Sequence, residues 1–97
     1  EILIVASSDM NHYEPDAVSR AKDARALEAV RALDGRELLE RCARERISMC
    51  GRVAVAALLE AARELGRAPG ETVAYATSGD ATGDRTAVVG YAGVVIP

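Results

Sequence analysis

The chain opens on an apolar run that gives way at once to polar residues. Residues 2–5, ILIV, are uninterrupted and rich in β-branched side chains, which predicts a strand buried on both faces of a parallel sheet. The following stretch, SSDMNHYEPD at residues 7–16, is polar and contains a proline, so it predicts a loop that lasts until about Ser19.

Apolar residues then recur at spacings of three and four, as they do on one face of a helix. This pattern predicts helices over residues 20–33, from Asp34 to about residue 46, and over residues 52–65. Asp34 with Glu37 forms an N-terminal capping box, and Gly66 is the residue that ends the third helix. The side chains expected to face inward are Ala21, Ala24, Leu27, Val30, Leu38, Leu39, Cys42, Ala43, Val55, Leu58, Leu59, Ala62 and Leu65.

The last third of the chain has strand character. Residues 72–77 and 86–96 predict strands, and SGDATGDR at residues 78–85 is interpreted as a plain loop between them. It has no P-loop lysine and no following helix, and its two acids would repel a phosphate. The predicted order is β-α-α-α-β-β.

Three strands, one of them apolar on both faces, make a poor independent sheet. We therefore expect an α/β fold in which residues 1–97 form a single segment of a larger mixed or parallel sheet flanked by helices. The chain enters its first strand at its second residue, without an initiator methionine. We interpret it as a fragment, or as the processed half, of a longer protein.

Composition narrows the classes of partner. Apolar residues make up 49% of the 97 residues but aromatic ones only 3%, so the core must be packed with Ala, Val, Leu and Ile. The 15 acidic and 12 basic residues are interspersed, which argues against a nucleic-acid partner. No apolar run approaches the roughly 20 residues of a membrane span. The first predicted strand does not follow a charged segment of the kind that begins a signal peptide, so we do not expect it to be one. We expect a cytoplasmic protein without a membrane partner.

Two polar side chains follow the end of the first predicted strand, where open α/β sheets bind ligands. Asp9 can orient His12, the only histidine of the chain, for metal binding or for general acid–base work. The alternative is that Asp9 caps a turn and that His12 is an ordinary loop residue. Both interpretations remain open from the residues alone.

Cys50 and Arg52 lie at the predicted start of the third helix. A thiol there meets the positive end of the helix dipole, which suits a thiolate nucleophile or metal ligand; a small buried apolar residue is the alternative. Arg52 is a candidate for binding an anionic substrate group, or else a surface arginine. Cys42 lies on the inward face of its helix and is interpreted as structural, and a disulfide between the two cysteines is not expected.

Four segments carry a resemblance to a known family. VASSDMNHY at residues 5–13, MCGRVAVAALLEAARELG at 49–66, YATSGDATGD at 75–84 and VVGYAGVVI at 88–96 resemble, in order and at compatible spacing, the C-terminal third of the Memo family. This family is known in microbes as AmmeMemoRadiSam system protein B. The resemblance implies an α/β fold similar to that of the class III extradiol ring-cleavage dioxygenases.

The resemblance also implies a metal centre. In the family, a metal such as iron or copper, with zinc as a further candidate, is held by two histidines and a cysteine, and that cysteine corresponds to Cys50. The family motif S-S-D-x-x-H falls on residues 7–12, so His12, oriented by Asp9, would transfer protons rather than act as a principal ligand. The two ligand histidines lie upstream of this chain. The partner this implies is therefore the N-terminal remainder of the protein, as the same or a separate chain.

Three functions remain in view. The first is a metal-dependent, dioxygenase-like oxidoreductase that acts on a small aromatic substrate. The second is a non-catalytic module of the same fold that binds a metal, a peptide or a protein. The third is a structural fragment that is incomplete by itself. Whether the chain takes part in an enzyme is left open at this stage.

Overall fold

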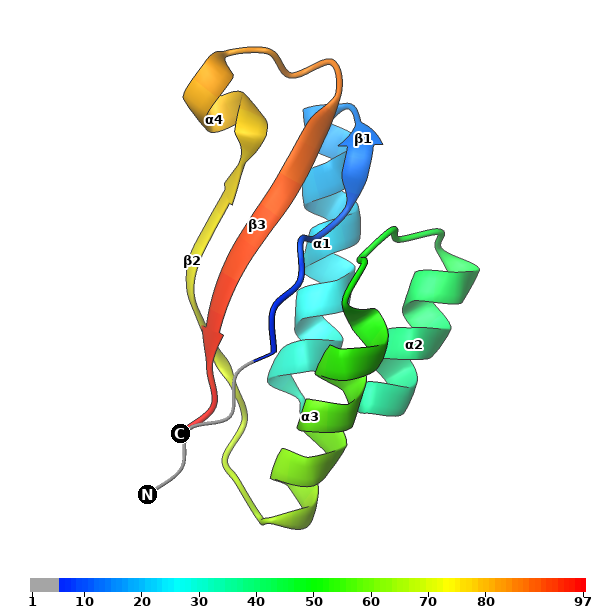
Figure 1. The fold of residues 1–97 in the computed structure, drawn as a ribbon, viewed down its shortest axis with the longest axis vertical. Coiled ribbons are helices and arrows are strands. Elements are labelled where there is room, and N and C mark those ends of the chain that lie inside the picture. Colours follow the sequence, from blue (N-terminus) through cyan, green and yellow to red (C-terminus); the bar gives the residue numbers. More distant parts are fainter. Residues whose placement is uncertain (1–5) are drawn as a thin grey trace.

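The computed structural model describes residues 6–97, in which a three-stranded sheet lies against helices (Figure 1). The observed order is β1, α1, α2, α3, β2, α4, β3. This confirms the α/β class. It adds helix α4 and strand β1 (His12–Glu14), which replaces part of the loop predicted from residue 7 to about Ser19. The strand predicted at residues 2–5 lies outside the described residues.

The three long helices occupy the segments that the apolar pattern marked. They are α1 (Asp16–Arg31), α2 (Gly35–Arg44) and α3 (Arg52–Glu64). Half of the capping box predicted for α2 is present, because the Asp34 carboxylate accepts a hydrogen bond from the Glu37 backbone N–H at 3.0 Å. The reciprocal bond is replaced, because the Asp34 backbone N–H donates to the Ala29 carbonyl oxygen at 3.0 Å. Gly66, just after α3, has a φ of 72°, which a glycine adopts without a steric penalty.

Helix α1 differs from its prediction at its start and in the face that it buries. It begins at Asp16, directly after Pro15, so the predicted loop to Ser19 was wrong; an acid in the first turn favours this start. Ala21 and Ala24 are exposed. The residues that are buried instead are Ser19, Asp23, Ala26, Leu27, Ala29 and Val30.

The sheet is antiparallel throughout the described part of the chain, whereas the strand expected to pair in parallel, residues 2–5, lies outside the described residues. The strands of the sheet are β1 (His12–Glu14), β2 (Glu71–Thr77) and β3 (Val88–Val95), in the order β1-β3-β2. The short connection between β2 and β3 explains why these two strands are antiparallel, because parallel neighbours need a crossover of a dozen or more residues. Two backbone hydrogen bonds with Gly90 extend the pairing of β1 upstream to Met10 and Asn11.

A short helix, α4 (Ser78–Thr82), replaces the plain loop predicted between the last two strands. The Asp80 carboxylate accepts a hydrogen bond from the Thr77 backbone N–H at 2.9 Å and pairs with Arg85 at 3.0 Å and Arg20 at 2.8 Å. These contacts, the Thr77 N–H first, lower the pKa of Asp80 to about 2. Partners such as Arg20, which is distant in sequence, thus stabilise a helical turn where the glycine-containing sequence predicted an irregular loop.

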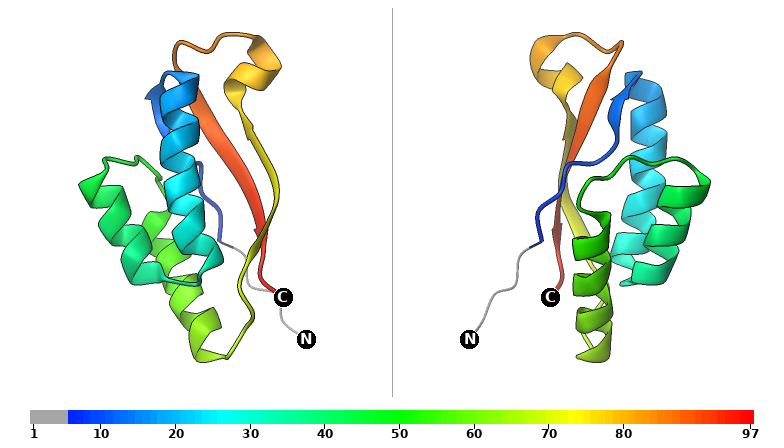
Figure 2. Two further views of the ribbon diagram at one scale, coloured as in Figure 1. Left: turned by 180° about the vertical axis from the view of Figure 1, so that it is seen from behind. Right: turned by 45° about the vertical axis from the view of Figure 1, so that its right-hand side comes forward.

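The core lies between the sheet and one layer of helices. Figure 2 shows α1, α2 and α3 on the same side of the sheet. Leu38, Leu59 and Val88 are completely buried, and the remaining core is mostly Ala, Val and Leu with Met10 and Met49. Leu65, predicted to face inward, is 70% exposed. Within residues 6–97, no helix combines the length and the apolar character that a membrane span requires.

Candidate metal centre

Two segments that are distant in sequence meet beside β1. One leads into β1 and carries Asp9 and His12, and the other precedes α3 and carries Cys50. Single ligand atoms of these three side chains all lie within 4.8 Å of one another. The Nε2 atom of His12 is 3.7 Å from an Asp9 carboxylate oxygen. The structure therefore brings together the three side chains that the sequence marked as candidates for chemistry.

Glycine 51 allows the two segments to approach closely. Its backbone N–H donates a hydrogen bond to the Ser8 hydroxyl at 2.8 Å, and the same hydroxyl lies 3.8 Å from the Cys50 sulfur. A β-carbon at position 51 would lie only 2.6 Å from the Ser8 β-carbon and 2.7 Å from the Ser7 carbonyl oxygen. Because real side chains do not approach so closely, a residue without a β-carbon is needed where Cys50 joins α3.

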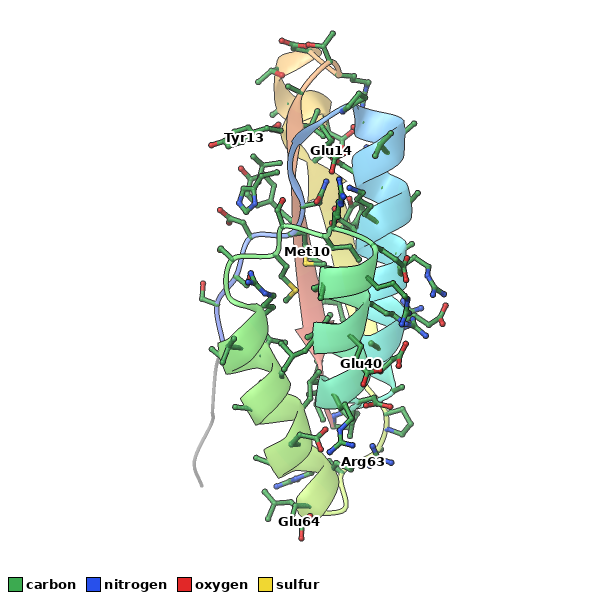
Figure 3. The ribbon with its side chains drawn as sticks, turned by 90° about the vertical axis from the view of Figure 1, so that its right-hand side faces the viewer. Met10, Tyr13, Glu14, Glu40, Arg63 and Glu64 are labelled. Atoms are coloured by element: carbon green, nitrogen blue, oxygen red, sulfur yellow. The ribbon has the colours of Figure 1, made fainter. Side chains whose placement is uncertain are left out.

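Ser48 holds His12 from the second segment. The His12 backbone N–H donates to the Ser48 hydroxyl at 2.8 Å, and Nδ1 of the ring lies 2.6 Å from the Ser48 carbonyl oxygen. The next residue, Tyr13, has a φ of 58°, an uncommon conformation for a tyrosine. Tyr13 and Glu14 point to opposite sides of the strand (Figure 3), with Tyr13 in solvent.

The cluster is open to solvent in this chain. The Asp9 side chain is 53% exposed, that of His12 is 20% exposed, and Cys50 is exposed. Cys42, by contrast, is buried in the core, as predicted for a structural cysteine, and burial raises the pKa of its thiol. Both cysteines are free. An exposed thiol beside an imidazole and a carboxylate offers sulfur, nitrogen and oxygen donors, a mixed set that suits a transition metal.

Comparison with known proteins places this sequence in a family. A family model described as Memo-like protein matches residues 1–95. The chain belongs to the Memo-like family. The match includes both segments of the cluster, so the four short motifs that suggested the resemblance lie within one continuous similarity.

Curated relatives extend the match to several organisms. A MEMO1 family protein of Methanocaldococcus jannaschii is 44% identical over 98% of this chain, and one of Methanopyrus kandleri is 42% identical over 96% of it. A MEMO1 family protein of Aquifex aeolicus is 41% identical over 98% of the chain. The matches cover 33%, 33% and 36% of these relatives, so the chain spans about a third of their length.

Arg52 has a contact within this Memo-like chain. It is the first residue of α3, and its guanidinium donates a hydrogen bond to the Met49 carbonyl oxygen at 3.2 Å. This bond supports the turn that carries Cys50. The binding of an anionic substrate group by Arg52 stays a prediction.

Sequence reasoning missed a buried polar network behind the cluster. Asp23 is 0% exposed and accepts hydrogen bonds from the Asn11 backbone N–H at 2.8 Å and from the Tyr75 hydroxyl. Burial raises the pKa of Asp23. One signal in the sequence could have revealed this network. The helical spacing of Ser19, Asp23, Ala26 and Val30 places them on one face of a helix, and such a face can be buried even when two of its residues are polar.

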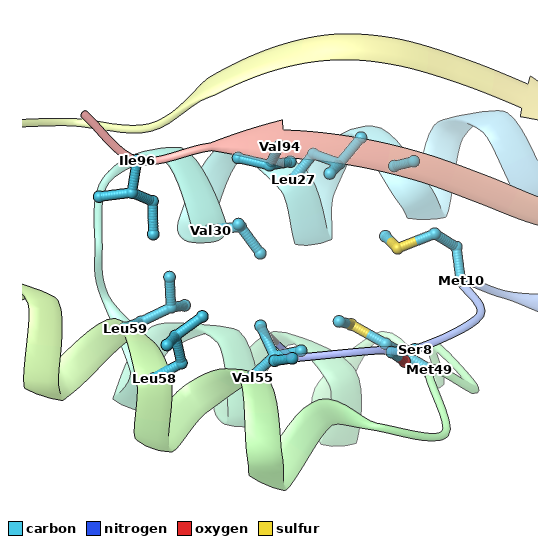
Figure 4. A pocket seen from close by; sticks show the side chains of 12 residues that line it. Ser8, Met10, Leu27, Val30, Met49, Val55, Leu58, Leu59, Val94 and Ile96 are labelled. Carbon is cyan, nitrogen blue, oxygen red and sulfur yellow. The ribbon is translucent and has the colours of Figure 1, made fainter. Parts of the chain in front are cut away.

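An apolar cavity of about 110 Å³ adjoins the cluster on its inner side. Figure 4 shows Met10 and Met49 at one end of it, with Val30, Leu59 and Ile96 further along. Ser8 also lines the cavity. Its hydroxyl lies near the Cys50 sulfur, so Ser8 borders both the cavity and the cluster. The cavity is too apolar to add metal ligands of the usual oxygen and nitrogen kinds.

Proposed function

We propose that this Memo-like chain supplies Cys50, His12 and Asp9 to the metal centre of a dioxygenase-like oxidoreductase. The observation that carries the proposal is the convergence of these ligand atoms, within 4.8 Å of one another, from segments about forty residues apart. Iron and copper are the metals that the family resemblance implies, with zinc as a further candidate; a cysteine ligand moves the preference toward softer ions than a carboxylate does.

Each side chain has a distinct role in this proposal. Cys50 is the metal ligand, and further ligands come from the rest of the longer protein. Bound iron or copper would supply redox chemistry toward dioxygen. His12, with Asp9 3.7 Å away, accepts a proton from a hydroxyl of a small aromatic substrate such as a catechol and returns one later, as a general acid–base residue does. The 20% exposure of His12 gives a substrate access to the ring.

The second candidate function is that of a module that binds a metal without catalysis. The Cys50 thiol favours this function. Thiolate ligands suit copper(I) and zinc, and neither ion in that state activates dioxygen for ring cleavage as iron does. A centre of this kind would bind its metal through Cys50 and would leave His12 without a substrate.

Metal analysis of two cysteine variants tests the ligand assignment. The complete protein that contains this chain is loaded with iron(II), copper(I) or zinc(II) under anaerobic reducing conditions, and bound metal is measured by mass spectrometry. Cys50→Ala should lower the bound metal at least tenfold. Cys42→Ala is the matched control, because Cys42 is buried in the core, and it should leave the metal content unchanged. An unchanged metal content in Cys50→Ala would disprove the assignment.

Oxygen uptake separates the two candidate functions. With the iron-loaded protein and a panel of catechols, the oxidoreductase proposal expects oxygen consumption that His12→Ala abolishes while the metal stays bound. Stoichiometric metal without oxygen uptake across the panel would support the binding module instead.

A further inference from the structure

We infer that Asn11 and Ser48 are positioning residues that keep the hydrogen of the neutral His12 ring on Nδ1. Nε2 then presents its lone pair to the side of the ring where Asp9 and Cys50 lie. The inference rests on the proposed function only for the use of that lone pair, and the hydrogen bonds that carry it lie within this chain.

The first step is the bond between His12 and the Ser48 backbone. Nδ1 lies 2.6 Å from the Ser48 carbonyl oxygen, and a carbonyl oxygen can only accept a hydrogen bond. Nδ1 must therefore carry the hydrogen. The other ring nitrogen, Nε2, is 3.7 Å from the Asp9 carboxylate, which is too long for a hydrogen bond that would compete for the ring hydrogen.

The Ser48 hydroxyl does not compensate for the opposite tautomer. It lies 3.4 Å from Nδ1 and could donate to an unprotonated Nδ1 only by giving up its own partner. Its hydrogen is directed to the Asn11 side-chain oxygen at 3.1 Å, while its oxygen accepts the His12 backbone N–H at 2.8 Å. The shorter contact to the carbonyl therefore decides the position of the ring hydrogen.

The second step is the side chain of Asn11, which is 0% exposed. Its oxygen accepts from the Ser48 backbone N–H at 2.9 Å and from the Ser48 hydroxyl at 3.1 Å. Its nitrogen donates to Glu14 at 2.9 Å and to the Ser19 hydroxyl at 3.3 Å. Two lone pairs and two hydrogens are thus all used. A flipped amide would place two donors against each other at the Ser48 N–H, so the amide has a single orientation.

These two steps connect the interior of the protein to the ring. The buried amide fixes the Ser48 peptide, and that peptide fixes the hydrogen of His12. Because a neutral imidazole has one donor and one acceptor nitrogen, Nε2 is left free to accept a proton or to bind a metal. In the opposite tautomer the hydrogen is on Nε2, so that nitrogen could neither accept a proton nor bind a metal.

The tautomer can be observed directly in the complete protein that contains this chain. With ring-¹⁵N-labelled histidine and no metal, the His12 signals in a long-range ¹H–¹⁵N correlation spectrum are those that His12→Gln removes. At a pH above which these signals no longer change, they show which nitrogen carries the hydrogen. The wild-type chain should show the Nδ1–H form. Hydrogen on Nε2, or an unbiased mixture of the two forms, would overturn the inference.

Variants then separate positioning from mere stability. Asn11→Ala should lower the ratio of Nδ1–H to Nε2–H about tenfold, as expected for the loss of about one hydrogen bond. Ser48→Ala, at an exposed position, keeps the carbonyl oxygen that accepts from Nδ1 and the backbone N–H that Asn11 holds, so it should leave the ratio within about twofold of the wild type. Ser78→Ala is the matched control, because its hydroxyl accepts only a remote backbone N–H, that of Val89 at 3.1 Å, and it should leave the ratio unchanged.

The outcomes are decisive even where a variant is unstable. If Asn11→Ala does not fold, Asn11→Ser, whose shorter polar side chain loses the contact with Ser48, takes its place, and an unchanged tautomer ratio in whichever of the two folds would overturn the inference. The measurement uses neither metal nor substrate. A failure of Cys50 to bind metal therefore leaves this result intact, and a wrong tautomer leaves the cysteine assignment intact.

Discussion

The hydroxyl of Tyr75 is the most informative single group to remove from the buried network. It donates a hydrogen bond to the Asp23 carboxylate, whose only other donor among the described contacts is the Asn11 backbone N–H at 2.8 Å. Because Asp23 is 0% exposed, water cannot replace the lost donor. Tyr75→Phe keeps the aromatic ring in place and removes only this bond.

The expected loss follows from the charge and the burial of the acceptor. A hydrogen bond to a charged group contributes about 1.5–3 kcal/mol, and an unsatisfied buried partner costs a similar amount. We therefore expect Tyr75→Phe to lower the free energy of unfolding by about 2 kcal/mol at pH 7. Urea unfolding followed by circular dichroism measures it, with the midpoint shifted and the m-value unchanged.

The pH dependence of this loss has a definite sign. Burial raises the native pKa of Asp23 above the unfolded value of about 3.9. Between these two values the native state holds a proton that the unfolded state has lost, so stability falls as the pH rises through that window. The Tyr75 hydroxyl favours the charged form, and its removal raises the native pKa of Asp23 further. The cost of Tyr75→Phe should therefore be larger at pH 7 than at pH 3.

Tyr91→Phe is the matched control, because Tyr91 is 46% exposed on β3. Loss of a hydroxyl there should change the unfolding free energy by less than about 0.5 kcal/mol. The reasoning is refuted if the two Tyr→Phe variants lower the unfolding free energy by the same amount, or if the loss caused by Tyr75→Phe grows as the pH falls.

Three further predictions concern the core, the metal cluster and α4. Leu38→Ala should lower the unfolding free energy, measured by urea titration, by about 2–5 kcal/mol, because the side chain is completely buried. Leu65→Ala, at a 70% exposed position, should lower it by less than about 0.5 kcal/mol in the same titration. Gly51→Ala should weaken metal binding at least tenfold in equilibrium dialysis. The β-carbon of the new alanine would lie 2.6 Å from that of Ser8 and would push the two segments apart. An unchanged metal affinity would show that the close approach of the two segments is not needed. Asp80→Asn should be less stable than wild type at pH 7, and the difference should shrink as the pH falls from about 4 to about 2. A carboxyl with a native pKa of about 2 contributes its full stability above its unfolded pKa and loses it as the pH falls to the native value. Thermal melts over this pH range measure the difference, and a difference that stays constant would contradict the prediction.

The candidate site was only partly visible in the sequence, because Asp, His and Cys can carry metal or acid–base chemistry but also have ordinary roles in loops and at helix starts. Asp9 and His12 are three residues apart in a polar stretch, and Cys50 directly precedes a helix, so each was a candidate before any contact was known. That the three side chains share one site was implied only by the family resemblance, because no local pattern reports a contact across about forty residues. The residues that orient the ring, Asn11 and Ser48, gave no signal by themselves.

The sequence by itself determined where two of the helices lie and where helices end. Helical spacing placed α2 and α3, and Asp34 and Gly66 marked helix ends, because these preferences act between residues within one turn of each other. The tertiary structure decided the rest. Asp23 lies in the core because partners from β2 and the segment before β1 satisfy its carboxylate, and β2 pairs antiparallel with β3 because the chain returns over a short connection. Whether a polar side chain is buried depends on partners distant in sequence, and only the folded chain brings those partners together.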